Sequence, residues 1–369
     1  MPEIVLKNIT KRWGNFVGVD NLNMVIKDHG FVTLLGPSGC GKTTTLRMIA
    51  GLETPTTGQI TIDGITVFDS EKGINLSPAK RDVGFLFQNY ALWPHMTVYQ
   101  NIAFGLENLK WKKDDIKARV EELLKMLKIE EFGKRYPSEL SGGQQQRVAI
   151  ARTLAPRPKV LFMDEPLSNL DAKLRLEMRT ELKRLHLETN ATFVYVTHDQ
   201  LEAMTLATEI CLMEKGVLQQ YAPPLEVYAH PNNLFVADFV GNPSMNFADA
   251  TATKLSKKSA EVSLHTLKAV FESSEEFELL SKDVVIGIRP EHIAIAKKGV
   301  KAKVYSSLPS GMETIVKVDL DGIILTLVVF GIIDYSVDEE IFINFKGDGI
   351  VLFDKESTNR LAVGKLIIQ

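Results

Sequence analysis

The segment of the chain best suited to chemistry is a glycine-rich loop that ends in a lysine and a threonine. Residues 36–43 read GPSGCGKT and fit the phosphate-loop pattern G-x-x-x-x-G-K-[ST]. Glycines let backbone N–H groups wrap a phosphate without Cβ clashes. Lys42 can meet the β- and γ-phosphates, and the Thr43 hydroxyl can reach Mg²⁺. An apolar stretch precedes the loop and a helical pattern follows it, which favours a nucleotide site over a chance glycine-rich turn.

Two carboxylates follow a second apolar stretch, KVLFMDEP, at residues 159–166. At the end of such a strand, Asp164 can hold Mg²⁺ through water. Glu165 points to the other side of the strand end, where it can orient or deprotonate an attacking water. Alone, this Asp-Glu pair would indicate only a solvated loop. In the same sheet as a phosphate loop, it favours a metal ligand next to a general base.

Three further residues have a weaker signal and an ordinary structural alternative. His198 ends the apolar stretch at residues 192–199 and could contact a γ-phosphate, although a strand-end histidine is more often structural. Gln88 also ends an apolar strand and could be a plain turn residue. Trp13 could stack on adenine, a contact worth about 1–3 kcal/mol per base, or could be ordinary packing.

A second anion-binding turn lies in LSGGQQQRVAIARTLA, residues 140–155. Ser-Gly-Gly before an amphipathic run predicts a helix start with free backbone N–H groups, which suit an anion. Because the chain already has a phosphate loop, this turn calls for a separate explanation.

The elements that position these residues alternate along residues 1–235. Short apolar strands alternate with helical patterns, among them residues 42–52 with Gly51 as C-cap and residues 171–188 with Asp171 as N-cap. This alternation predicts a mostly parallel sheet covered by helices. Prolines and asparagines cluster in residues 223–247, as at a domain junction, and short β-rich segments then predict a small barrel in residues 236–369.

Composition limits the remaining classes. The 369 residues are 45% hydrophobic and 24% charged, with a net charge of −3, which gives no whole-chain reason to expect a nucleic-acid partner. The two cysteines are too few for a disulfide framework and favour a reducing compartment. The longest apolar run, residues 322–333, is shorter than the roughly 20 residues of a membrane span, so we expect a buried strand there. The N-terminal residues lack the apolar region of a signal peptide.

Together these motifs resemble the ATPases of ABC transporters. GPSGCGKT, Gln88, LSGGQ, LFMDEP, SNLDA and the Thr-His pair at residues 197–198 occur in that family's order and spacing. The tail, with GNPSMNF and IGIRPEHI, resembles the C-terminal OB-like (TOBE) domain of the maltose/multiple-sugar importer ATPases. The resemblance implies an α/β P-loop NTPase with a mixed, mostly parallel sheet, a helical subdomain at about residues 89–155, and an all-β OB-like barrel domain.

The resemblance also implies roles for individual residues. Trp13 would stack on adenine, Glu165 would be the general base, and His198 would hold the γ-phosphate. Asp164 would serve the metal, Gln88 would touch Mg²⁺ and the water, and Asp171 would lie at a dimer seam. The residues that would cradle the phosphates and Mg²⁺ are Ser38, Gly39, Cys40, Gly41, Lys42, Thr43 and Thr44. The family's signature motif would comprise Ser141, Gly142, Gly143 and Gln144.

By the same resemblance, the chain would be the ATP-hydrolysing subunit of an importer. It would work as a homodimer, or as a heterodimer with a relative, on the cytoplasmic face of a separate permease fed by an extracytoplasmic binding protein. Sugars are the favoured cargo. Polyamine, molybdate, sulfate and iron remain open, because their importers share the same ATPase plan. Residues 67–85 also form a longer segment than in the sugar-importer relatives, like that of some oxyanion importers. A non-transport ABC ATPase is disfavoured, since there is one motif set and no long heptad stretch. The C-terminal domain could support the dimer, bind a regulator, or both.

Overall fold

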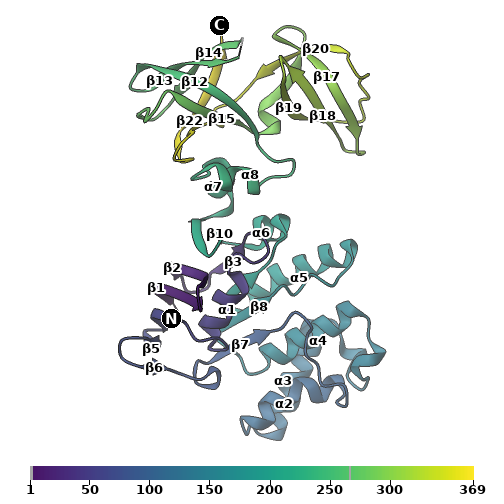
Figure 1. The fold of residues 1–369 in the computed structure, drawn as a ribbon. Helices are drawn as coiled ribbons and strands as arrows, with labels where there is room; N and C mark the ends of the chain where they lie inside the picture. Colours follow the sequence, from purple (N-terminus) through teal and green to yellow (C-terminus); the bar gives the residue numbers. More distant parts are fainter. Residues whose placement is uncertain (1–2, 266) are drawn as a thin grey trace. The chain divides into compact units, whose positions relative to one another are not determined.

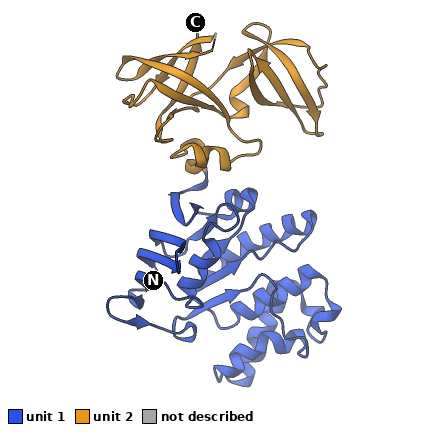
Figure 2. Ribbon diagram, viewed as in Figure 1, with its two compact units in different colours: residues 1–224 blue, residues 225–369 orange. Residues whose placement is uncertain are grey.

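The computed structural model describes residues 3–265 and 267–369, and it divides the chain into two compact units. The first unit is Met1–Pro224 and the second is Leu225–Gln369, shown in blue and orange in Figure 2. The short helices α7 (Pro224–Ala229) and α8 (Leu234–Phe239) stand at the start of the second unit. The domain boundary drawn from sequence, between residues 235 and 236, falls within α8 and stays a prediction.

The centre of the first unit is a six-stranded sheet in the order β11-β10-β3-β9-β8-β7. Neighbouring strands from β10 to β7 are parallel, and only β11 is antiparallel to its neighbour. Every residue of β3, β8 and β9 is buried, which is why these segments read as unbroken apolar runs. The predicted mixed, mostly parallel sheet is therefore confirmed. Its strands are β3 (Phe31–Leu35), β7 (Val83–Leu86), β8 (Val160–Asp164), β9 (Thr192–Val196), β10 (Glu209–Glu214) and β11 (Val217–Ala222).

A second, antiparallel sheet of five strands lies in the same unit, in the order β2-β1-β4-β5-β6. The sequence did not predict that these strands form a sheet of their own. Alternating apolar residues indicate a half-buried strand, but they do not show to which sheet the strand belongs. It carries Trp13 at the end of its first strand. Its strands are β1 (Ile4–Trp13), β2 (Phe16–Ile26), β4 (Thr57–Ile62), β5 (Ile65–Asp69) and β6 (Ile74–Asn75).

Three helices of the first unit form a group of their own. Figure 1 shows α2, α3 and α4 together in the lower part of the view, and their apolar faces share one core, which confirms the helical subdomain. The predicted caps are also confirmed: Gly51 ends α1 in a left-handed conformation, and the Asp171 carboxylate accepts from Leu174 N–H at the start of α5. The helices are α1 (Lys42–Ala50), α2 (Val98–Asn108), α3 (Lys113–Met126), α4 (Gly142–Leu154), α5 (Ala172–Thr189) and α6 (Gln200–Leu206).

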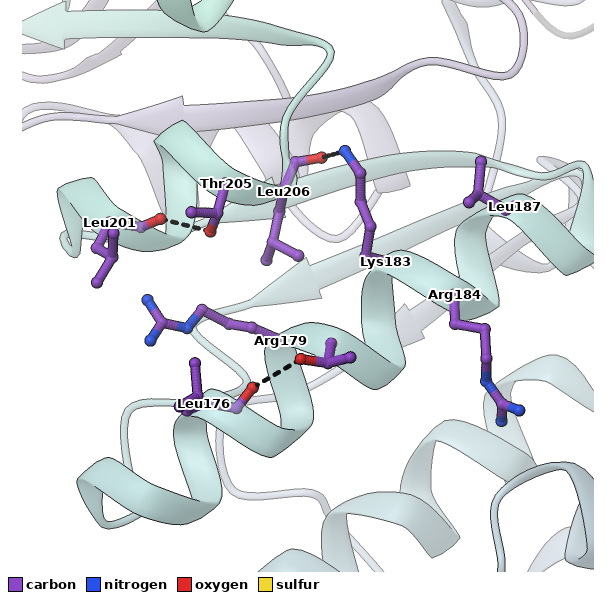
Figure 3. Close-up of a pocket in the computed structure, with 9 residues that line it drawn as sticks. Leu176, Arg179, Lys183, Arg184, Leu187, Leu201, Thr205 and Leu206 are labelled. Carbon is purple, nitrogen blue, oxygen red and sulfur yellow. Dashed lines mark hydrogen bonds between the residues drawn. The ribbon is translucent and has the colours of Figure 1, made fainter.

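Between α5 and α6 lies a surface groove of about 550 Å³. Lys183 Nζ donates to the Leu206 carbonyl at 2.9 Å and joins the two helices on one side of it. Figure 3 shows the Arg179 side chain in this groove, with exposed Leu176 and Leu201 beside it.

The second unit is all-β apart from short helical turns. A closed barrel, β12-β13-β14-β22-β21-β15, confirms the predicted OB-like barrel. A separate five-stranded sheet, β16-β20-β17-β18-β19, shares its core and was not anticipated. The barrel strands are β12 (Asn246–Ser256), β13 (Ser259–Leu264), β14 (Leu267–Ser273), β15 (Asp283–Ile288), β21 (Ile350–Asp354) and β22 (Arg360–Ile368); the others are β16 (Ile293–Ala296), β17 (Val300–Pro309), β18 (Glu313–Leu320), β19 (Ile323–Phe330) and β20 (Glu340–Phe345).

The apolar run at residues 322–333 is a strand, but the expected full burial is wrong. In β19, Leu325 and Leu327 are buried, whereas Phe330 is 82% exposed and Ile332 beyond it is 74% exposed. The reason is that β19 is an edge strand of an antiparallel sheet, which presents one face to solvent whatever its composition.

Arg289, in the IGIRPEHI segment, is a structural tie within the second unit. Its guanidinium is only 2% exposed and donates to the carbonyls of Ala237, Val240 and Tyr228. It also lies 4.1 Å from the centre of the Tyr228 ring. One side chain therefore fastens α7 and α8 to the barrel strand β15. In the described part of the chain, we find no helix with both the length and the apolar content needed to cross a bilayer.

Candidate nucleotide site

The site residues gather where the parallel strands end. The phosphate loop follows β3, His198 follows β9, Asp164 ends β8, and Gln88 follows β7. These four strands are consecutive neighbours in the sheet, so their carboxyl ends lie side by side. Ligands bind at this edge in open α/β sheets. The topology thus brings together residues that come from widely separated parts of the chain.

The phosphate loop has the backbone conformation that its glycines permit. Gly36, Gly39 and Gly41 have φ of 145°, 79° and 101°, a region that side chains rarely adopt. A Cβ at Gly41 would stand 2.6 Å from the Gly18 carbonyl oxygen, so no other residue fits there. Lys42 is buried, and its ammonium group donates to the Gly36 and Pro37 carbonyls at 2.7 and 2.8 Å. The positive charge is therefore held inside the loop.

Ser38, Cys40 and Thr44 occupy the loop and the first turn of α1, with different exposure. Ser38 is exposed and Thr44 half-buried, whereas Cys40 is only 3% exposed. The Cys40 Sγ lies 3.7 Å from Lys42 Nζ, and burial raises the pKa of the thiol. The Cys40 side chain thus belongs to the core, and this residue can contribute only backbone groups to a bound phosphate.

Thr43 and Asp164 meet beside the loop and fit a magnesium ion. Thr43 Oγ1 donates to Asp164 Oδ1 at 2.9 Å, and Arg47 Nη2 lies 3.3 Å from Asp164 Oδ2. A hydroxyl and a carboxylate oxygen are ligands that this hard cation prefers. Among the described residues, no three His, Cys, Asp or Glu side chains cluster as a metal cage. The pair therefore suits an ion that takes most of its ligands from nucleotide phosphates and water.

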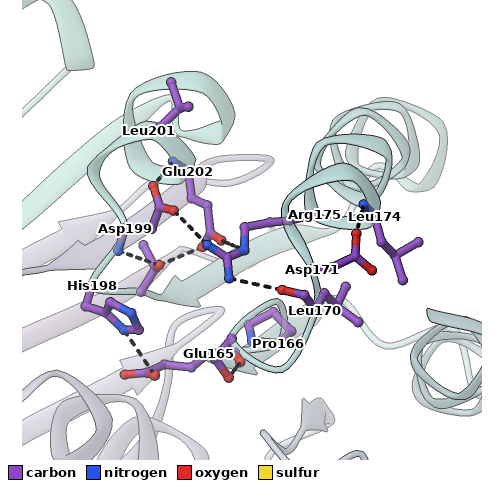
Figure 4. A network of polar contacts seen from close by, with 12 residues as sticks. Glu165, Pro166, Leu170, Asp171, Leu174, Arg175, His198, Asp199, Leu201 and Glu202 are labelled. Carbon is purple, nitrogen blue, oxygen red and sulfur yellow. Dashed lines mark hydrogen bonds and ion pairs between the residues drawn. The ribbon is translucent and has the colours of Figure 1, made fainter. Parts of the chain in front are cut away.

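Glu165 and His198 form a pair across the ends of β8 and β9 (Figure 4). His198 Nδ1 lies 3.2 Å from Glu165 Oε2, and the two side chains are 58% and 24% exposed. Glu165 has φ of +44°, unusual for a residue with a long side chain, while its N–H donates to the Val196 carbonyl. Such local strain is common at functional sites. The turned backbone holds a carboxylate that water can reach next to an imidazole.

Gln88 contacts the segment that follows Glu165. Its side-chain Nε2 donates to Ser168 Oγ at 3.3 Å, and its backbone carbonyl accepts from Asn169 Nδ2 at 3.3 Å. The structure therefore joins Gln88 to residues 168–171, which we call the seam loop. Asp171 closes this loop by capping α5.

Trp13 lies at the end of β1 with an accessible ring. It is 44% exposed, stacks beside Phe16 with centroids 6.2 Å apart, and has Lys11 Nζ 5.1 Å from its centre. A Cβ at Gly18 would come within 2.4 Å of the ring, so glycine at that position lets the indole lie against β2. With 44% of its surface exposed, Trp13 is a candidate for stacking on a base.

The LSGGQ segment begins α4, as predicted. Ser141 Oγ accepts from Gln144 N–H, and the Gln144 side chain accepts from Ser141 N–H, a reciprocal capping box. A Cβ at Gly143 would come within 2.6 Å of the Leu174 side chain on α5, so a larger residue there would force that leucine to shift. Ser141 and Gln144 therefore form these hydrogen bonds with each other.

Sequence reasoning missed four residues beside the site. Arg47 pairs with Asp164, and Arg175, Tyr195 and Glu202 form a network with the residues around His198. The available signal was the Asp-x-x-Glu spacing at residues 199–202, which predicts a helix cap but not the long-range partners.

A phosphate loop at the end of a buried parallel strand, with partner acids on the next strand but one, defines the class of P-loop nucleoside triphosphatases. The family model described as "ABC transporter" matches residues 19–168, and the model "MalK OB fold domain" matches residues 241–293.

Relatives match most or all of the chain. It is 50% identical over 294 residues to the trehalose/maltose import ATP-binding protein MalK of Thermococcus litoralis, covering 79% of each. It is 42% identical to the oligosaccharides import ATP-binding protein MsmX of Bacillus subtilis, covering 98% of this chain and 100% of that one. The dimeric ATP-binding cassette MJ0796, solved with ADP and Pi, matches with a TM-score of 0.52 at 35% identity, over 60% of this chain and 98% of that chain.

The chain belongs to the ATP-binding subunits of ABC importers that carry a MalK-type OB-fold domain. It is an ATPase of the nucleotide-binding ABC class.

Proposed function

We propose that this ATPase powers the uptake of a sugar or oligosaccharide through a separate membrane permease. The observation that carries the proposal is the full-length match to an oligosaccharide import ATP-binding protein, second unit included. The test is reconstitution with a permease and its binding protein, followed by uptake and ATPase assays with sugars. Stimulation by polyamine, molybdate, sulfate or iron instead of sugar would overturn the cargo assignment.

We propose roles for the site residues that follow from their positions. Thr43, Asp164 and Gln88 would hold Mg²⁺, which when bound neutralises charge on the β- and γ-phosphates. Lys42 binds the same phosphates, and the loop N–H groups add the partial positive charge of the α1 terminus. Glu165 orients and deprotonates the attacking water, and His198 holds the γ-phosphate opposite it. Ser38, Gly39, Cys40, Gly41 and Thr44 complete the cradle.

A dimer would give the LSGGQ segment a function as an anion-binding site for the nucleotide of a second subunit. The capping box leaves the first N–H groups of α4, at Gly142 and Gly143, available to an anion. In a head-to-tail pair, Ser141 and these groups would face the γ-phosphate on the other subunit, with Asp171 at the seam. One ATP would then lie between two chains, and a two-fold pair would close two equivalent sites. A homodimer or a heterodimer with a relative satisfies this geometry.

The other partners follow from the importer role. The chain would sit on the cytoplasmic face of the membrane as a peripheral subunit, and the extracytoplasmic binding protein would reach it through the permease. Its net charge of −3 does not favour nucleic acid. The second unit would support the dimer, bind a regulator, or do both.

Removal of the Trp13 ring is expected to weaken ATP binding. Trp13→Ala should raise the dissociation constant for ATP by about 5- to 150-fold, the equivalent of 1–3 kcal/mol of base stacking. Trp13→Phe keeps an aromatic face and should lose much less. Calorimetric titration with ATP and with inorganic triphosphate checks the cause, because triphosphate affinity should stay unchanged. Equal losses for both ligands would contradict stacking.

Charge reversal on the helical subdomain is expected to uncouple transport from hydrolysis. A surface cavity of about 650 Å³ there is lined by Tyr99 and Gln100 of α2 and by the exposed carboxylates Glu130 and Glu131. We propose that the permease docks on this side. Glu130→Lys combined with Glu131→Lys should abolish sugar uptake while basal ATPase activity stays within about twofold, since surface substitutions rarely disturb the fold. Unchanged uptake by the reconstituted complex would contradict docking there.

A further inference from the structure

A buried carboxylate outside the proposed catalytic set lies one turn beyond His198. Glu202, on α6, is only 3% exposed. It accepts hydrogen bonds from Tyr195 Oη at 2.7 Å and from Thr197 Oγ1 at 2.6 Å. Thr197 Oγ1 in turn accepts from Asp199 N–H, so the hydroxyl and the carboxylate shape the turn that presents His198. We call residues 197–199 the histidine loop.

Arg175 of α5 lies near Glu202 and the histidine loop, and it also contacts the seam loop (Figure 4). Arg175 Nε lies 4.0 Å from Glu202 Oε1, and Arg175 Nη1 lies 3.5 Å from Asp199 Oδ2. Arg175 Nη2 donates to the Leu170 carbonyl at 3.1 Å. Leu170 directly precedes Asp171, and Asp199 directly follows His198. A single guanidinium thus spans the two loops that flank Glu165.

The three contacts of Arg175, two with carboxylates and one with a backbone carbonyl, suit an arginine better than a lysine. A guanidinium offers five donors in a planar fork and can meet three acceptors in different directions, which an ammonium group on a flexible chain cannot do with the same geometry. Burial raises the pKa of Glu202, and Arg175 opposes that rise. Glu202 is buried, whereas the Arg175 side chain is 31% exposed, so solvent screens part of their attraction. Removal of Arg175 would take away a cation beside a buried carboxylate and the hydrogen bond to the Leu170 carbonyl. The Arg175 guanidinium therefore connects the two loops.

We propose that Arg175 and Glu202 are positioning residues that hold the histidine loop and the seam loop in one arrangement. His198 already lies against Glu165 in the single chain, and closure of a second subunit on the seam loop then acts through Arg175 on the direction of His198 toward the γ-phosphate. The inference rests on the dimeric hydrolysis mechanism of the proposed function and not on its cargo. Failure to transport sugar would leave it standing, and unchanged hydrolysis in the variants below would overturn it with sugar import untouched.

The test compares steady-state hydrolysis by the full chain and two glutamine variants of α5. Arg175→Gln should lower kcat by about 3- to 30-fold, while the KM for ATP stays within about twofold because the phosphate loop is intact. Arg179→Gln is the matched control: it lies one turn further along α5, with its side chain in the groove of Figure 3. It should hydrolyse like the wild type. A normal kcat for Arg175→Gln, or a loss confined to KM, would overturn the proposal.

A double-mutant cycle separates coupling from general damage. Glu202→Gln keeps the shape and an oxygen acceptor but removes the charge. If the two residues act as a unit, the double variant should lose no more activity than the worse single variant. Losses that multiply would overturn the proposal.

Should Glu202→Gln fail to fold, Asp199→Asn takes its place in the cycle, since asparagine preserves the cap on α6 and removes only the charge that faces Arg175. Arg175→Lys should recover only part of the loss, because it restores charge without the fork.

Discussion

Glu165→Gln is expected to leave ATP binding intact and to lower the turnover of ATP by about 100- to 10,000-fold, the usual contribution of a general base. The amide keeps the size of the side chain and can still lie near His198, which is 3.2 Å from the carboxylate. It cannot accept the proton of the attacking water. Nucleotide affinity should persist because the phosphate contacts come from the loop after β3.

The measurement is phosphate release at saturating ATP, together with calorimetric titration of nucleotide. Glu275→Gln, at an exposed glutamate of the second unit, is a control that removes the same charge far along the chain from the site and should behave as wild type. Hydrolysis by Glu165→Gln above about one tenth of the wild-type rate would exclude Glu165 as the base.

Ser141→Arg is expected to abolish ATP-dependent dimer closure while the monomer still binds ATP. The side chain at position 141 stands at the start of α4, where an arginine would add bulk and charge between the helix terminus and the phosphate of a second subunit. Hydrolysis, which in our proposal needs the closed dimer, should fall by about 100-fold or more, as when a donor aimed at the reacting group is lost.

The capping role of Ser141 makes a second variant necessary. Ser141 Oγ accepts from Gln144 N–H, so any substitution removes a cap worth about 0.5–2 kcal/mol of stability. Ser141→Ala loses the same cap without adding bulk, and it should still close. Light scattering with ATP, in a Glu165→Gln background that prevents turnover, reports the dimer directly. Closure by Ser141→Arg to the wild-type extent would contradict the proposed trans site.

Features that depend on residues close together along the chain could be predicted from the sequence, whereas features that depend on distant residues could not. The caps at Gly51 and Asp171 and the helix start at residues 141–143 depend on residues within a few positions of one another, so spacing alone predicted them correctly. The burial of residues 322–333 could not be predicted in that way. Whether both faces of an apolar strand are covered depends on what packs against each face of its sheet, and those packing partners lie elsewhere in the chain.

Cys40 shows the same limit within a motif that was otherwise predicted well. Its place in GPSGCGKT implied a nucleotide contact, yet the direction of its side chain was set by the packing of the first unit's core. A motif specifies the backbone of a loop because its glycines permit positive φ values that other residues rarely adopt. The orientation of the other side chains depends on what packs behind the loop.

By itself the sequence determined the chemistry of this protein: a phosphate loop, a strand ending in two acids, a capped signature helix and a β-rich tail, each readable from a short stretch. The tertiary structure alone decided which of these meet. Thr43 joins Asp164 across 121 positions, and Gln88 joins Ser168 across 80. Arg175 ties the seam loop to the histidine loop through acceptors that no spacing reveals. The physical reason is that caps and turns are local hydrogen bonds, whereas the network depends on which parallel strands lie side by side, and only the packed sheet sets that order.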